Sequence, residues 1–416
     1  MRTSSVVRGT ASAASGMLLV GIASVPAHAA GVKQWQLDAY GAEEIWQLSK
    51  GEGVTVAVID SGVDKDNPDL RGRVLRGKDF ATGKPGDETT DYDGHGTSMA
   101  GLIAGTGQRD GGNGAFGLAP AAKILPVRVP GAADSAEFIR VVPDAIRFAA
   151  DSGVKVIDIS TAVATDSPQL AEAAKYALDK GALVFAGVGD DAEKGNKPMY
   201  PAATPGVVGV GATDDKARRI PMSQYGPQVD LVAPGKDTVA ACGTGICKSS
   251  GTGNAAALVS AAAALLWSKH PDWTNNQVLK VMLNTVAKPS GGEEHSNYVG
   301  YGAARPLRTL KTPGDPGPAG VRPIDDLAEN ITAPSASASA TPAPRRPPPK
   351  TAATPPSGSA WGSVRPCWSV PRSPYPYSGP GGAELDPCRR PSVTHSWGSR
   401  CRSTKSGAKS AARPRR

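Results

Sequence analysis

The stretch Val54-Thr55-Val56-Ala57-Val58-Ile59-Asp60-Ser61-Gly62-Val63 is a short apolar run that ends on an acid. An apolar run of about six residues, followed by turn-forming Ser and Gly, predicts a strand buried on both faces of a parallel sheet. Taken alone, Asp60 is better explained as a turn carboxylate, so a catalytic role depends on what the rest of the chain places beside it.

Apolar runs of the same kind alternate with segments of helical length. The runs occupy residues 123–129, 154–159, 182–186 and 207–210, and the helical segments occupy 98–105, 136–152, 167–180, 254–267 and 274–286. Strands that alternate with helices at this spacing predict right-handed crossovers. The expected fold class is therefore α/β, a doubly wound, mostly parallel sheet with helices on both faces.

Two further stretches contain residue types that suit peptide-bond chemistry. Asp93-Gly94-His95-Gly96-Thr97-Ser98-Met99-Ala100-Gly101 places a histidine between glycines at the start of a helix, and Gly251-Thr252-Gly253-Asn254-Ala255-Ala256-Ala257 opens a second one. With the acid at the end of the first strand, they resemble, in order, the Asp, His and Ser boxes of the subtilisin-like (subtilase) family of serine peptidases. The resemblance implies a subtilisin-like fold, in which Asp60 orients His95.

The resemblance extends over residues 33 to 308. Gly117-Leu118-Ala119-Pro120 with the strand that follows, and Val232-Ala233-Pro234-Gly235, are similar to later family segments. The start of the chain, Gln34-Trp35-Gln36-Leu37, and a proline-rich stretch after a short catalytic domain are similar to mycosins, the membrane-anchored subtilases of actinobacterial type VII secretion systems. This resemblance implies an association with the type VII secretion machinery.

The chain departs from the family at two chemically essential positions. Where the family has its nucleophilic serine, this sequence has Gly253, which offers no side-chain oxygen. Loss of that serine lowers turnover about 2 × 10⁶-fold in the family's reference enzyme. Where the family has the asparagine that donates to the oxyanion, this sequence has Asp190, and loss of that donor costs about 10² to 10³ in rate.

Smaller departures lie nearby. Ser160-Thr161-Ala162 stands where Ser-Leu-Gly lines the family's substrate groove, and Ala257 and Ala261 replace a proline and a glycine. Ser249 and Ser250 are the nearest upstream hydroxyls, but three extended residues span about 10 Å. We therefore do not expect either serine to replace the missing nucleophile.

These residues favour a catalytically inactive pseudopeptidase that retains a peptide-binding or secretion-complex-binding role. The alternative is an active serine endopeptidase of the Asp-His-Ser type that processes secreted proteins, and it requires another nucleophile. The sequence contains no phosphate-binding loop and no Cys/His spacing typical of zinc, so no cofactor and no metal are predicted. The part of the chain before the basic tail is mildly acidic, and nothing there predicts nucleic-acid binding.

The first 30 residues have a basic start, a short apolar stretch and small residues at Ala27-His28-Ala29, the pattern of a secretory signal peptide. Export to the cell exterior or cell surface would allow Cys242 and Cys247 to form a disulfide, with two unpaired thiols as the alternative. The other three cysteines, in the tail, make the total odd. At least one thiol must therefore stay free or pair between chains.

The last hundred residues differ in composition from the rest. The chain contains 50 glycines and 37 prolines, and from Thr312 Pro, Ala, Ser and Thr dominate; the fourteen Lys or Arg after Ala340 account for the net charge of +8. Such a segment lacks the apolar content that offsets ordering entropy. The predicted domains are a signal peptide (1–30), a peptidase-like domain (31–312) and a disordered linker and basic tail (313–416). We predict no transmembrane helix in the tail, because it has no apolar stretch of about 20 residues. One hypothesis is that a shifted reading frame after about Pro344 replaced the membrane anchor that mycosins carry.

Overall fold

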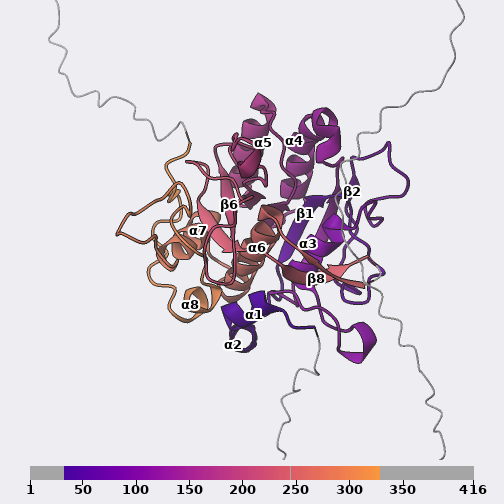
Figure 1. The fold of residues 1–416 in the computed structure, drawn as a ribbon, viewed down its shortest axis with the longest axis horizontal. Coiled ribbons are helices and arrows are strands. Elements are labelled where there is room, and N and C mark those ends of the chain that lie inside the picture. Colours follow the sequence, from indigo (N-terminus) through magenta and orange to yellow (C-terminus); the bar gives the residue numbers. More distant parts are fainter. Residues whose placement is uncertain (1–31, 244, 328–416) are drawn as a thin grey trace, which may run out of the picture. The chain divides into compact units, whose positions relative to one another are not determined.

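The computed structural model describes residues 32–243 and 245–327, so the predicted signal peptide and the tail beyond 327 lie outside the described residues. Seven parallel strands form one sheet in the order β2-β3-β1-β4-β5-β6-β7 (Figure 1). They are β1 (Thr55–Asp60), β2 (Lys78–Asp79), β3 (Lys123–Arg128), β4 (Val156–Ile159), β5 (Leu183–Gly187), β6 (Val207–Thr213) and β7 (Leu231–Pro234). The predicted α/β fold is confirmed.

Helices cover both faces of the sheet (Figure 1). The helices are α1 (Trp35–Tyr40), α2 (Ala42–Leu48), α3 (His95–Ala104), α4 (Ser135–Asp151), α5 (Pro168–Asp179), α6 (Thr252–Lys269), α7 (Asn275–Asn284) and α8 (Pro306–Lys311), with 3-10 turns at Arg109–Gly111, Ala132–Asp134 and Ala192–Lys194. Val56 and Val58 of β1 pack into the core that contains α3 and α6, whereas Ala57 and Ile59 pack into the core that contains α4 and α5. This alternation explains why the strand is apolar at every position.

Helix α6 is the buried centre of the domain. Its residues from Thr252 to Trp267 are all buried, and it packs on α3 and on β4 to β7. The alanine-rich sequence allows this close approach on all sides. Within residues 32–243 and 245–327, no helix combines the length and hydropathy of a bilayer span.

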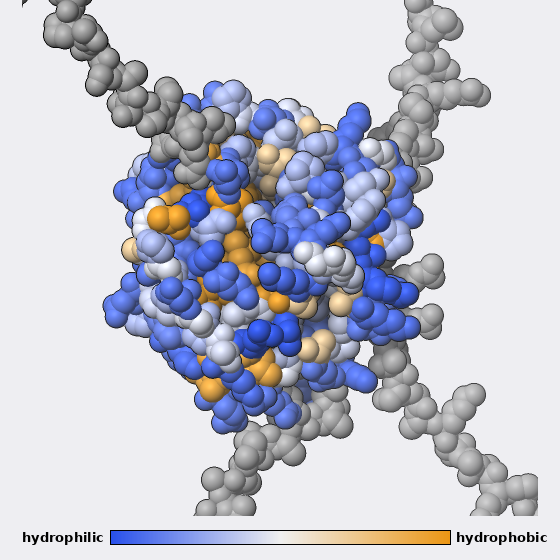
Figure 2. All heavy atoms as spheres, turned by 90° about the vertical axis from the view of Figure 1, so that its left-hand side faces the viewer, coloured by the Kyte–Doolittle hydropathy of each residue, from blue (hydrophilic) through white to orange (hydrophobic). Residues whose placement is uncertain are grey.

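The packed part of the chain extends beyond Thr312, where composition predicts that it ends. Ile324 is only 5% exposed, the carbonyl of Ala319 accepts from the Thr274 hydroxyl at 2.9 Å, and Asp326 accepts from the backbone N–H of Gly206 at 2.8 Å. The predicted boundary is therefore too early for residues 313–327. This extended segment is ordered by side-chain-to-backbone hydrogen bonds, which composition does not reveal. Figure 2 shows this side of the molecule, largely hydrophilic with a strip of apolar surface.

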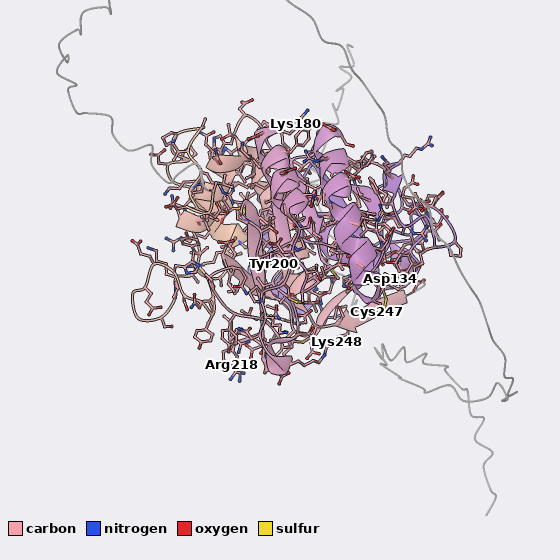
Figure 3. The ribbon with its side chains drawn as sticks, turned by 90° about the horizontal axis from the view of Figure 1, so that it is seen from above. Asp134, Lys180, Tyr200, Arg218, Cys247 and Lys248 are labelled. Atoms are coloured by element: carbon pink, nitrogen blue, oxygen red, sulfur yellow. A yellow bond between two sulfur atoms is a disulfide. The ribbon has the colours of Figure 1, made fainter. Side chains whose placement is uncertain are left out.

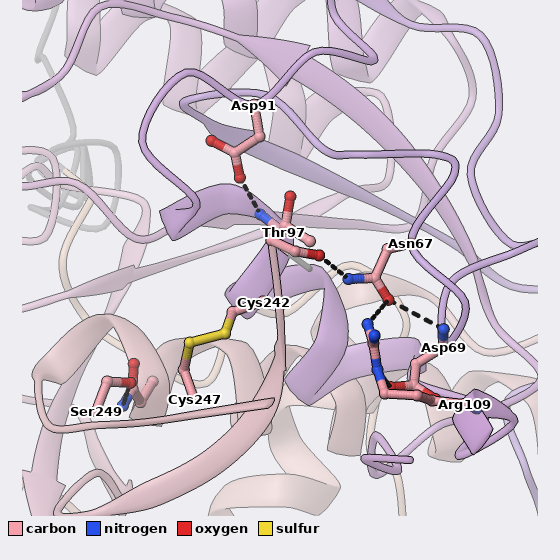
Figure 4. The surroundings of a disulfide bond; sticks show 10 residues. Asn67, Asp69, Asp91, Thr97, Arg109, Cys242, Cys247 and Ser249 are labelled. Atoms are coloured by element: carbon pink, nitrogen blue, oxygen red, sulfur yellow. Dashed lines mark hydrogen bonds and ion pairs between the residues drawn. A yellow bond between two sulfur atoms is a disulfide. The ribbon is translucent and has the colours of Figure 1, made fainter. Parts of the chain in front are cut away.

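A small antiparallel hairpin, β8 (Thr238–Cys242) and β9 (Gly245–Ser249), leads into α6. A disulfide joins Cys242 and Cys247 across it (Figures 3 and 4). The amide of Gln36 donates to the carbonyl of Val239 at 2.7 Å and ties the N-terminal helices to this hairpin. The cysteines in the tail lie outside the described residues.

Candidate functional site

Asp60 and His95 face one another where β1 ends and α3 begins. Nδ1 of His95 lies 2.9 Å and 3.0 Å from the two carboxylate oxygens of Asp60. The Asp60 side chain is 2% exposed, whereas that of His95 is 44% exposed. A Cβ on Gly96 would lie 2.1 Å from the carbonyl oxygen of Gly62, so only glycine lets the two segments approach this closely.

The start of α3 is held by a second carboxylate that the sequence analysis does not single out. Asp91 accepts from the backbone N–H of Gly94 at 2.8 Å and of Thr97 at 2.7 Å, the latter contact shown in Figure 4. The Ser61 hydroxyl donates to Asp91 at 2.7 Å. Acids near a helix N-terminus are favourable, and this one fixes the segment that carries His95.

The carboxylates around His95 set its charge. Desolvation lowers the pKa of the imidazole, but the negative charge and hydrogen bond of Asp60, with further help from Asp93 and Asp91, outweigh it and raise the pKa to about 9. His95 is therefore mainly a cation at neutral pH, paired with Asp60. Among the described residues, no Ser or Thr hydroxyl forms a hydrogen bond with its other ring nitrogen.

Gly253 lies in the first turn of α6, beside the end of β4. A Cβ built on Gly253 would lie 2.9 Å from the carbonyl oxygen of Ser160 and 3.0 Å from its Cβ. The Ser160 hydroxyl lies 3.3 Å from the Gly253 carbonyl oxygen. The Ser160 hydroxyl therefore lies close to the backbone of Gly253, but it also lies 2.8 Å from Asp158 and donates to it.

Asp190 follows β5 and contacts the first residue of α6. Its Oδ1 accepts from the backbone N–H of Thr252 at 2.8 Å. Burial raises the pKa of Asp190 to about 6, although the hydrogen bonds from Thr252 and the positive charge of His95 oppose the increase. The side chain therefore holds the helix start, and above pH 6 it is mainly an anion that cannot donate to an oxyanion.

The predicted groove segment Ser160–Ala162 leaves the sheet directly after β4 and is partly exposed. Its neighbour in the sheet is β5, in which Ala186 pairs with Ile159. Beyond β5 the chain continues through Val188 to Asp190. The groove segment and Asp190 therefore follow neighbouring parallel strands at the same end of the sheet. The first turn of α6 contacts both, through Gly253 to Ser160 and through Thr252 to Asp190.

Asp158 is the functional-site carboxylate that the sequence analysis missed. It is the only acid in the strand Val156–Ile159, it is 0% exposed, and it accepts from the hydroxyls of Ser160 at 2.8 Å and Ser260 at 3.0 Å. Burial raises its pKa to about 7, against the two hydroxyl hydrogen bonds. An acid inside an otherwise apolar strand was the signal that could have identified it.

The two serines upstream of α6 are engaged elsewhere. Ser249 Oγ accepts from the Asn254 amide at 2.9 Å, and Ser250 Oγ accepts from the backbone N–H of Asp237 at 2.8 Å. Neither hydroxyl forms a hydrogen bond with His95. In the described part of the chain, no group of His, Cys, Asp and Glu side chains is arranged to hold a metal ion.

Comparison with known proteins agrees with this geometry. The subtilase family (Peptidase_S8) matches residues 51–302. The thermophilic serine proteinase of Bacillus sp. (strain AK1) is 36% identical over 255 residues, which cover 61% of this chain and 61% of that protein. Thermitase of Thermoactinomyces vulgaris is 35% identical over 253 residues, which cover 60% of this chain and 87% of that protein. The chain thus spans about three fifths of the first relative's length.

Among solved structures, MycP1 from Mycobacterium smegmatis matches with a TM-score of 0.61 and 27% identity, covering 69% of this chain and 86% of that one. The MycP3 protease of the type VII (ESX-3) secretion system matches with a TM-score of 0.59 and 31% identity, covering 69% and 90%. An intact ESX-5 inner membrane complex also contains a matching chain, with a TM-score of 0.61 and 27% identity over 76% and 85%. The chain described here therefore belongs to the subtilase family, and its structural neighbours include mycosins of type VII secretion.

Proposed function

We propose that this protein is an exported, mycosin-like subtilase that has lost peptidase activity and uses the former active-site region to bind an extended peptide. The observation that carries the proposal is the absence of any side-chain oxygen at Gly253, in the first turn of α6, while the Asp60–His95 pair keeps distances of 2.9 and 3.0 Å. Covalent catalysis by this family requires a nucleophilic oxygen in reach of the imidazole.

The position of Asp190 supports the same proposal. An ionised carboxylate beside the start of α6 accepts hydrogen bonds and repels a developing oxyanion. The raised pKa of His95, about 9, adds a further obstacle, because a protonated imidazole cannot accept a proton from a hydroxyl.

A binding role agrees with what remains in place. The segment Ser160–Ala162 is partly exposed beside the site. An extended peptide that adds to an exposed strand binds through backbone hydrogen bonds, which do not depend on the nucleophile. The matches to MycP1, MycP3 and a chain of the ESX-5 complex support docking on type VII secretion machinery as the setting for this role.

Two measurements on the purified chain test the proposal. We expect no labelling by a serine-directed phosphonate, and we expect short peptides that bind the protein to be recovered intact after prolonged incubation. The intact Asp60–His95 pair is what the alternative function, an active endopeptidase, would use. Stoichiometric labelling or peptide cleavage would establish that alternative, and mapping the labelled peptide would identify the serine.

A further inference from the structure

Two carboxylates lie near Gly253, and neither forms an ion pair among the described residues, although the charge of His95 lowers the pKa of both. Asp190 follows β5, and its hydrogen-bonding neighbour is Thr252. Asp158 accepts hydrogen bonds from the hydroxyls of Ser160 and Ser260. Carboxylates that are removed from water without a counter-charge are costly, and the raised pKa values of both groups reflect this cost.

An unpartnered acceptor lies beside Asp190. Gln224 is 1% exposed, and its Oε1 has no hydrogen-bond partner within the described residues. Its backbone N–H donates to the carbonyl of Gly189 at 2.9 Å, and a Cβ on Gly189 would lie 2.4 Å from that Oε1. The Gln224 amide is therefore packed against Gly189, the residue that precedes Asp190.

The charges that act on Asp190 come from α3 and from the turn that follows β5. His95 on α3 is a cation, but Asp60, Asp91 and Asp93 surround it. Asp191, the next residue after Asp190, repels it and is itself paired with Lys194 at 2.9 Å. Helix α6 carries no charged residue before Lys269 at its far end. A peptidase would be hindered by such a site, whereas a binding protein can use it.

We infer that Asp190, with Gln224 beside it, binds a cationic group of the peptide ligand, an ammonium or a guanidinium with several N–H donors. The inference rests on the proposed peptide-binding function and names its ligand chemistry. A guanidinium offers donors for both the Asp190 carboxylate and the Gln224 oxygen. Asp190 is partly exposed, so a ligand can reach it from the side of the groove segment.

The experiment uses the full chain and two peptides, an acetylated and amidated alanine hexapeptide with one central arginine and the same peptide with neutral citrulline. Calorimetry at pH 7.5 should show the arginine peptide binding about tenfold more tightly, the size of effect expected of one charge-assisted hydrogen bond in a partly buried site. Asp190→Asn, which keeps an acceptor for the Thr252 N–H, should remove this preference, and Gln224→Leu should reduce it.

Asp191→Asn is the matched control, because it removes the same charge from the next residue in the chain. The carboxylate of Asp191 already has a partner, Lys194. This variant should keep the preference for arginine. Lowering the pH to 5 should weaken the preference in the native chain but not in Asp190→Asn, since Asp190 becomes protonated.

The outcomes separate this inference from the proposed function. Equal affinity for both peptides in the native chain would overturn the cation site and leave peptide binding intact. Equal weakening of both peptides by Asp190→Asn would show that the residue only supports α6, and would also overturn it. Binding of neither peptide would contradict the peptide-binding role itself, and the cation site with it.

Discussion

Restoring the missing serine tests the interpretation of Gly253 and Asp190 together. Gly253→Ser returns an oxygen to the first turn of α6, and Gly253→Ser with Asp190→Asn returns the oxyanion donor as well. The two variants share the Asp60–His95 pair and differ only at position 190, whose charge also acts on His95. The ratio of their kcat/KM values therefore isolates position 190.

The size of this ratio follows from the charge of Asp190. Its pKa of about 6 leaves about 10% of the carboxyl ionised at pH 5 and about 97% ionised at pH 7.5. A protonated carboxyl has an O–H that can donate much as an asparagine does, whereas the carboxylate cannot. We expect the double variant to be about as active as the single variant at pH 5. At pH 7.5 it should be about 30-fold more active, with the ratio levelling off near 10² to 10³ at higher pH.

The assay is hydrolysis of a peptide p-nitroanilide between pH 5 and 9. Both absolute rates should increase toward pH 9, because His95 loses its proton in this range. A ratio that stays constant with pH, or a single variant as active as the double at pH 8, would refute the role assigned to Asp190. Activity in neither variant, with the fold intact, would refute the assignment of position 253.

Crowding at position 253 needs its own control. A new Cβ would approach the Ser160 carbonyl oxygen to 2.9 Å, closer than a Cβ normally comes to a backbone atom, so the backbone at Ser160 or at the start of α6 must shift. Gly253→Ala introduces the same Cβ without the hydroxyl. We expect its thermal stability to stay close to that of the native chain, because the better helix propensity of alanine, worth about 1 kcal/mol, offsets the close contact.

Three further predictions concern stability. Asp158→Asn should stabilise the domain at pH 8 by up to about 4 kcal/mol in urea unfolding, and by nothing at pH 4. The reason is that the buried carboxyl, with its pKa of about 7, keeps a proton that the unfolded chain releases above pH 4. A gain in stability that is independent of pH would contradict this. Replacing Cys242 and Cys247 by serine should cost about 2 kcal/mol, the entropy of a short loop, and lower the Tm by a few degrees, whereas an unchanged Tm would indicate that the hairpin is held by other contacts. A chain that ends at residue 312 should unfold at a lower temperature than one that ends at 327, because it loses the buried Ile324; equal Tm values would show that this segment adds no stability.

Much of the fold was predictable because its strands are buried on both faces and its helices are bounded by clear signals. The segment 274–286, predicted to be helical, contains α7, which begins with a full capping box between Thr274 and Gln277. The short strand β2 and the hairpin that carries the disulfide were not predicted. A two-residue strand is too short to show a period, and neither strand of the hairpin alternates, because β8 is buried at every position and β9 is mostly half-buried.

The site divides in the same way. Motif order placed Asp60 and His95 together, and the structure brings them within 3.0 Å. It did not identify Asp158 or Gln224, because their properties come from burial and from partners that are distant in the chain. A sequence motif indicates which side chains can react, whereas the charge of a buried acid depends on the solvent and donors that the fold leaves to it.

Helix α6 is enclosed by β4 to β7, α3, α7 and α8, and it is held there by its alanines and leucines rather than by a side chain at position 253. The hydroxyl that defines the chemistry of this family therefore contributes little to the assembly of its architecture. A protein can lose this oxygen and keep the same fold. Similarity of fold therefore does not establish catalytic activity, which depends on the few atoms that react.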